Sequence, residues 1–140
     1  MQFSAVFTIV ASVIAAWWSY WTHRQNTRLE RAKWIKDLYE KFYERNDLKA
    51  VRDLVDSGDR AKIAELVGKE ESHFTDYLNF FEFLGYLEES KQVQRKDILG
   101  IFHYYLASLK GDKEISRYVN DTKNGFEMLR KLLNKVKVKE

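Results

Sequence analysis

The sequence predicts an all-α protein: an N-terminal transmembrane helix continuous with a cytosolic helical bundle of about five further helices. Three observations predict this class. Proline is absent and only six glycines occur among 140 residues, so helix breakers are rare. Residues 3–22 carry no charge. In the rest of the chain, apolar residues recur at helical spacing. We therefore divide the chain into a transmembrane helix at residues 1–22 and a cytosolic helical domain at residues 23–140.

For residues 3–22, the predicted surroundings are lipid. Twenty helical residues span about 30 Å, which matches the hydrocarbon core of a bilayer. Aromatic rings, which favour the headgroup layer, end the segment, and basic residues, which favour the cytoplasmic side, follow at once. We predict a bacterial inner-membrane protein with its N-terminus outside and its C-terminal domain in the cytoplasm. The predicted membrane-interface anchors are Trp17, Trp18, Trp21, Arg24 and Arg28.

Two other interpretations of this segment are open. A cleaved secretory signal would need a positive region before the apolar run and a small-x-small site after it, and the sequence has neither. A buried helix of a soluble domain is the other interpretation, although an apolar run of this length is long for that role. The uncleaved anchor accounts best for the tryptophan-rich end.

Small and hydroxyl residues recur every three or four positions in the predicted anchor, which places them along one side of the helix. Such a side lets two helix backbones approach closely, and hydroxyl bonds between helices contribute about 1 kcal/mol. The alternative is that each hydroxyl bonds a carbonyl of its own helix and the pattern has no function. We predict an oligomer or pore face made of Ser4, Thr8, Ser12, Ala15 and Ser19.

The first cytosolic helices are predicted from breaker and capping residues. No Gly or Pro precedes Gly58, so the anchor helix continues to about residue 44. Residues 46–57 then form a short amphipathic helix, which an Asn or Asp caps and a Ser-Gly pair ends. Asp59 caps a second short helix over residues 59–67, and the two form a helical hairpin.

The central helix of the domain is predicted over residues 72–87, because this stretch is apolar on nearly all sides. A polar turn separates it from a helix over residues 95–110, which ends before a glycine. Residues 112–136 form the last helical region. Its apolar residues keep a 3.6-residue period, and we predict one helix with a bend at Gly125.

Two polar residues, Asn79 and Glu82, lie one turn apart inside the aromatic central helix. A carboxylate buried there is costly to desolvate unless it is paired. Arg52, on the first helix of the predicted hairpin, is the candidate partner. We predict a buried polar network of Arg52, Asn79 and Glu82 that fixes the register of the helices, with a ligand pocket at the same residues as the alternative.

The sequence offers little chemistry for catalysis. It has no cysteine, which removes disulfides, thiolate metal sites and cysteine nucleophiles. The three histidines have no metal-ligand spacing, and no phosphate-binding loop or nucleophile motif is present. A net charge of +3 is too small to indicate nucleic acid by itself. We expect a protein that is not an enzyme, with no cofactor and no metal. The expected partners are membrane lipid, further copies of the chain and a protein bound to the cytosolic domain, and nucleic acid is not expected.

Three stretches carry a resemblance to known proteins: RLERAKWIKDLYEKFY at residues 28–43, AVRDLVDSG at residues 50–58 and YLNFFEFLGYLEES at residues 77–90. With their L-N-F-F-E core and Arg52, they resemble an uncharacterised family of small bacterial single-pass membrane proteins, a domain of unknown function. More loosely, the architecture is similar to the ring-forming membrane accessory proteins of RNA-targeting (type VI) CRISPR systems. The second resemblance implies rings that perforate the inner membrane.

Together these features predict an inner-membrane protein that acts by self-assembly through its transmembrane helix. The more specific form of this hypothesis is a pore-forming effector in bacterial stress or antiviral defence. The alternative is a monomeric membrane tether or adaptor whose cytosolic helical domain recruits a protein partner. A third hypothesis is an enzyme with an unrecognised site at Arg52, Asn79 and Glu82.

Overall fold

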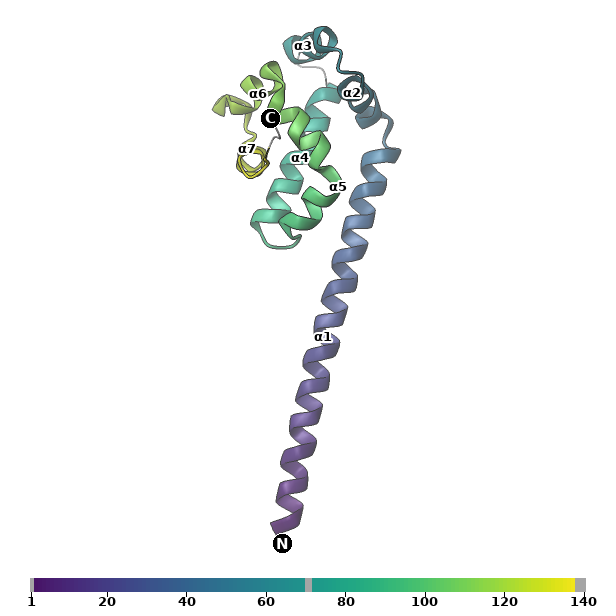
Figure 1. The fold of residues 1–140 in the computed structure, drawn as a ribbon, viewed down its shortest axis with the longest axis vertical. Coiled ribbons are helices and arrows are strands. Elements are labelled where there is room, and N and C mark those ends of the chain that lie inside the picture. The colour runs from purple at the N-terminus through teal and green to yellow at the C-terminus, as the bar shows by residue number, and fades with distance from the viewer. Residues whose placement is uncertain (1, 70–71, 138–140) are drawn as a thin grey trace. The chain divides into compact units, whose positions relative to one another are not determined.

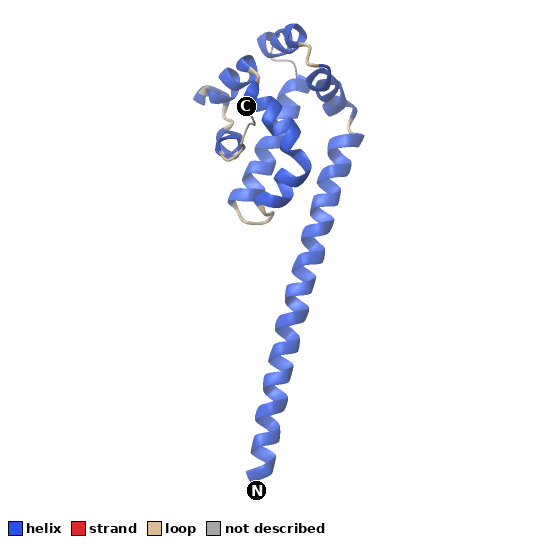
Figure 2. Cartoon of the chain, in the orientation of Figure 1, coloured by secondary structure: helices blue, strands red, loops and turns tan. Residues whose placement is uncertain are grey.

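The structure is a computed structural model that describes residues 2–69 and 72–137, with side chains described from residue 11 onward. These residues form helices and no strand, so the predicted all-α class is confirmed (Figure 1; Figure 2). The elements are α1 (Gln2–Glu44), α2 (Asn46–Ser57), α3 (Arg60–Lys69), α4 (Ser72–Glu89), α5 (Arg95–Gly111), α6 (Lys113–Asn120), the 3-10 helix η1 (Thr122–Asn124) and α7 (Glu127–Asn134).

The chain divides into two compact units, Met1–Trp34 and Ile35–Glu140. The first unit is the long N-terminal part of α1. The second contains the last turns of α1 together with α2 to α7, and we call it the helical domain. Because α1 is one uninterrupted helix of 43 residues, the predicted continuity between the N-terminal helix and the first helix of the domain is confirmed.

The core of the helical domain is organised around Phe42, near the end of α1. Its ring is fully buried and lies within 6 Å of rings from both α4 and α5. Aromatic pairs at such separations contribute about 1 kcal/mol each beyond the burial of apolar area. The last turns of α1 are therefore part of the domain's core. The rings around Phe42 belong to Tyr77, Phe80, Phe81, Phe102 and Tyr105.

The α4 and α7 helices cross at Gly85. A Cβ atom at this position would lie 2.5 Å from the backbone oxygen of Met128 and 2.7 Å from its carbonyl carbon. Real Cβ atoms do not approach backbone atoms so closely, so the crossing requires a residue without a side chain. The sequence shows a glycine in the central helix but not this reason for it.

The last helical region differs from the prediction. One bent helix over residues 112–136 is wrong, because α6 ends at Asn120 and α7 begins only at Glu127. Asp121 between them has an extended backbone, and Gly125 has φ of +80°, a left-handed conformation that favours glycine. The domain therefore has six α-helices after α1 in the described residues, where about five were predicted.

The predicted Asp59 cap is confirmed, and Asp112 forms a second side-chain cap. The Asp59 carboxylate accepts from the Lys62 N–H, and the Asp112 carboxylate accepts from two N–H groups of the first turn of α6. The predicted Asn or Asp cap of α2 is wrong. Arg45 occupies that position without a side-chain cap, and its guanidinium pairs with Asp47 instead.

Substituting Gly85 with alanine tests the crossing of α4 and α7. Gly85→Ala is expected to lower the free energy of unfolding by about 3 kcal/mol, because the new methyl group meets backbone that must move. The matched control is Gly100→Ala in α5, where a Cβ meets open space. That change is expected to stabilise the domain by up to about 1 kcal/mol through helix propensity. Chemical denaturation of both variants is the measurement, and equal stability would contradict the crossing.

Candidate functional site

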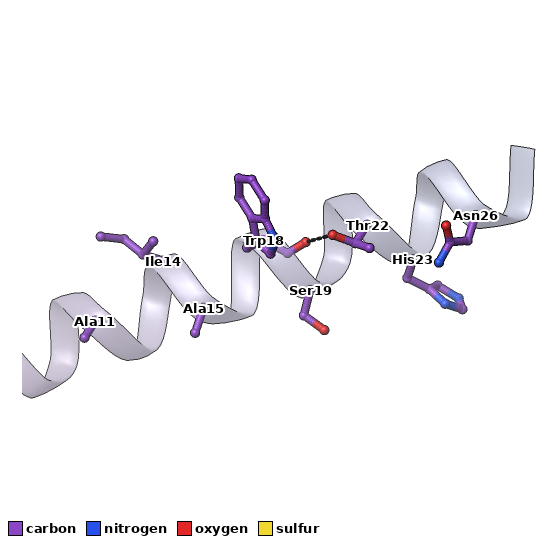
Figure 3. A pocket seen from close by; sticks show the side chains of 8 residues that line it. All are labelled: Ala11, Ile14, Ala15, Trp18, Ser19, Thr22, His23 and Asn26. Carbon is purple, nitrogen blue, oxygen red and sulfur yellow. Dashed lines mark hydrogen bonds between the residues drawn. The ribbon is translucent and has the colours of Figure 1, made fainter.

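One side of α1 forms a shallow concavity, which we call the small face (Figure 3). Figure 3 shows Ala11, Ala15 and Ser19 projecting from one side of the helix, one turn apart. Such a row allows another helix backbone to approach closely. The residues that line the small face are Ala11, Ile14, Ala15, Trp18, Ser19, Thr22, His23 and Asn26.

The small face only partly coincides with the predicted oligomer or pore face. Ala15 and Ser19 line it, and Ser12 is exposed on the same helix but is not among the lining residues. The side chains of Ser4 and Thr8 lie outside the described residues. Of the five residues predicted for the oligomer or pore face, the small face therefore contains Ala15 and Ser19.

At least one hydroxyl group of the small face is satisfied within its own helix. The Thr22 hydroxyl donates to the Trp18 carbonyl over 2.9 Å, as Figure 3 shows. Thr27, five residues further along, donates in the same way to the His23 carbonyl. Since Thr22 needs no hydroxyl partner on a second helix, close packing of small residues is the interaction that the small face offers.

Around the small face, α1 exposes large apolar and aromatic side chains. The exposed fraction is 72% for Trp17, 67% for Trp18 and 51% for Trp21, and Val13 and Ile14 are exposed as well. A helix in water normally keeps such residues on one buried face. Arg24 and Arg28, two of the predicted membrane-interface anchors, follow the tryptophans and are also exposed.

Within the described part of the chain, we find no helix that is both long enough and apolar enough to span a bilayer.

The predicted buried network of Arg52, Asn79 and Glu82 is wrong, because the three side chains have separate surroundings. Arg52 is buried, and its Nη1 donates to the Phe42 carbonyl over 2.7 Å. That carbonyl belongs to the last turn of α1, where backbone acceptors lack partners in their own helix. The guanidinium also lies 4.7 Å from the centre of the Tyr43 ring. Arg52 therefore caps the C-terminal end of α1, where a cation is favoured.

Glu82 instead caps the N-terminal end of α7. Its two carboxylate oxygens accept hydrogen bonds from the N–H groups of Met128, over 3.0 Å, and Leu129, over 2.6 Å. The residue at the cap position itself, Phe126, makes no side-chain cap. A carboxylate from α4 thus satisfies two backbone donors of α7 and meets the positive end of its dipole. Asn79, the third predicted member, is exposed.

A third charged contact, missed from the sequence, joins the end of α4 to its neighbours. Glu88 pairs with Arg95 at the start of α5 and with Lys135 at the end of α7. Burial of the Glu88 carboxyl opposes its ionisation, but hydrogen bonds from Lys135 and Arg95 outweigh this effect and lower its pKa. These two ion pairs connect the end of α4 with the start of α5 and the end of α7.

Two buried phenols, Tyr77 and Tyr105, have rings packed against Phe42. Burial raises the pKa of Tyr77 well above its ordinary value, and the Tyr77 hydroxyl has no hydrogen-bond partner among the described residues. Burial, aided by a hydrogen bond with Tyr43, also raises the pKa of Tyr105. Both phenols therefore stay protonated at neutral pH, and neither supplies a phenolate base.

A second hollow lies between α2, α3, α5 and α6, with Arg60 and Lys113 among its lining residues. The carboxylate of Asp112 already accepts from the Glu114 and Ile115 N–H groups at the start of α6, so these two donors are not available to an anion. Across the described ranges, no group of three His, Cys, Asp or Glu side chains is arranged to hold a metal ion.

Comparison of the chain with protein-family models, with curated proteins and with solved structures finds no match.

The capping role of Glu82 is tested against its neighbour on the same helix. Glu82→Ala is expected to lower the free energy of unfolding by about 2 kcal/mol, since two N–H groups of α7 lose a charged acceptor. Asn79→Ala is expected to change it by no more than about 0.5 kcal/mol, because Asn79 is exposed. Chemical denaturation and amide exchange at Met128 and Leu129 are the measurements. Equal losses in both variants would restore the buried network and contradict the cap.

Proposed function

We propose that this protein is a single-pass bacterial inner-membrane protein that self-assembles through the small face of α1 and holds its helical domain at the cytoplasmic surface. Residues 1–22 are the proposed transmembrane helix and residues 23–140 the proposed cytosolic part. The observation that carries the proposal is the surface of α1, which combines a row of small residues with large apolar side chains exposed around it.

The exposed apolar surface supports membrane insertion. Side chains such as Val13, Trp17 and Tyr20 leave more than half of their surface uncovered. Exposure of apolar area to water costs about 25 cal/mol per Å², and a tryptophan buries 150–250 Å² when it is covered, so lipid is a better solvent for this helix. The proposal uses the whole uncharged run of residues 3–22, of which the structure describes side chains from residue 11.

The small face supports self-assembly. A row with Ala11, Ala15 and Ser19 at intervals of four residues is the pattern along which transmembrane helices pack closely. Lipid tails cannot fill such a shallow groove as well as a second helix does, so van der Waals contact favours pairing. The partner that this face fits is another copy of the same helix.

We extend this proposal to a pore-forming effector. In a ring of several copies, the edge of the small face that carries the Ser19 hydroxyl would border the centre, where it offers a polar wall to water. The role in bacterial stress or antiviral defence is proposed from the sequence resemblance alone. Release of entrapped ions from vesicles measures this extension separately from assembly.

A monomeric tether is the second candidate function, and aromatic residues on the surface of the helical domain favour it. Tyr39 and Tyr104 are about half exposed, as are Phe83 and Tyr86 on α4. Aromatic rings of this kind are enriched where proteins bind one another. On this account the domain recruits a protein partner, and α1 serves only to hold it at the membrane.

The assembly is tested by placing the same substitution on two adjacent residues. Ala15→Leu fills the small face and is expected to weaken association about tenfold, which corresponds to about 1.4 kcal/mol. Ala16→Leu makes the same change about 100° around the helix and is expected to leave association unchanged. The measurement is the mass of the full-length protein in detergent, over a range of concentrations, by light scattering.

Three results would count against parts of this proposal. A wild-type chain that is monomeric at every concentration would exclude self-assembly and favour the tether. Equal weakening by Ala15→Leu and Ala16→Leu would place the contact elsewhere on α1. An assembled wild type that releases no entrapped ions would exclude the pore and leave the assembly in place.

A further inference from the structure

A second stripe runs along α1, on the side away from the small face. Trp17, Trp21, Arg24, Arg28 and Arg31 follow one another at intervals of four, three, four and three residues. At 3.6 residues per turn, this spacing keeps all five on one side of a helix. All are exposed except Arg31, which is half-buried. We call these five residues the basic stripe.

The basic stripe and the small face are nearly opposite. Ala15 and Trp17 are two residues apart, as are Ser19 and Trp21, and Asn26 and Arg28. Two residues correspond to about 200° around an α-helix. A copy that turns its small face toward other copies therefore turns its basic stripe outward.

The three arginines of the basic stripe have no carboxylate partner within residues 2–69 and 72–137. Most ion pairs in those ranges lie elsewhere and use basic residues of the helical domain. These paired residues are Lys36, Arg45, Lys62, Lys69, Arg95, Arg117, Lys131 and Lys135. The stripe thus carries positive charge that no described carboxylate pairs with.

We propose that the basic stripe binds the headgroups of anionic phospholipids. This inference rests on the proposed membrane insertion of α1. Trp17 and Trp21 set the depth, because indole rings favour the headgroup layer. Arg24 lies about 4.5 Å further along the axis than Trp21 and Arg28 about 10 Å further, within reach of phosphate for long side chains. A guanidinium donates two parallel hydrogen bonds to a phosphate. In a lipid with a net negative charge, no cationic group of the same headgroup competes with the arginine for that phosphate.

The stripe also orients the helix about its own axis. Anionic lipids gathered on the side of Arg24 and Arg28 leave the opposite, small face for contact with other copies. In a ring of copies, these two arginines lie on the outer rim and not at the centre. Lipid binding and assembly therefore use different sides of the same helix.

The experiment is quenching of tryptophan fluorescence in vesicles. The full-length protein is reconstituted into phosphatidylcholine containing phosphatidylglycerol, with bromine carried on one lipid or on the other at equal mole fraction. One basic residue at an anionic surface changes lipid affinity about fivefold. Brominated phosphatidylglycerol is therefore expected to quench wild-type fluorescence severalfold more efficiently than brominated phosphatidylcholine.

Two variants that lose the same charge test whether the preference for phosphatidylglycerol depends on the basic stripe. Arg24→Gln with Arg28→Gln is expected to abolish the preference for brominated phosphatidylglycerol. Lys41→Gln with Lys49→Gln removes two exposed charges in the domain and is expected to keep it. Salt near 1 M, which reduces the Debye length to about 3 Å, is expected to weaken the wild-type preference.

The outcomes separate this inference from the proposed function. Equal quenching of wild type by both brominated lipids would overturn lipid binding and leave insertion standing. Loss of preference in both charge variants would overturn the assignment to the basic stripe. Absence of quenching by either lipid would show that α1 is outside the bilayer, which would overturn the proposed function together with this inference.

Discussion

The surroundings of α1 are the constraint on which the rest depends. Between Val13 and Trp21 the helix exposes large apolar and aromatic side chains over nearly half of its circumference. No single folding partner in the described chain covers that surface, and water is a poor solvent for it. Under the proposed function, lipid covers the large apolar residues and further copies of the same helix cover the small face. Every functional proposal follows from that division.

The helical domain is held together at helix ends as much as in its core. Arg52 satisfies the Phe42 carbonyl near the end of α1, Glu82 satisfies two N-terminal amides of α7, and Glu88 joins the ends of α4, α5 and α7. In each case the sign of the charge suits the end of the helix or the partner that it meets. The last turns of α1 are therefore held in the domain by two contacts: the hydrogen bond from Arg52 to the Phe42 carbonyl and the cluster of aromatic rings around Phe42.

The sequence predicted the helices well and the polar contacts poorly, for a physical reason. Apolar periods and glycines located α2 to α5 within a few residues, since burial and helix ends leave a pattern along the chain. That pattern shows that Arg52 and Glu82 need partners. It does not show that the partners are backbone groups, which every residue carries. The close approach at Gly85 and the break at Asp121 depend on tertiary contacts and local backbone conformation that no spacing reveals.

The measurement that tests the central claim most directly is alkaline carbonate extraction of membranes from cells that express the full-length chain. The account predicts that the wild type stays in the membrane pellet and is released only by detergent. Val13→Arg, which costs about 3 kcal/mol at the centre of a bilayer, is predicted to move much of the protein to the supernatant. A wild-type chain recovered in the supernatant without detergent would contradict the account.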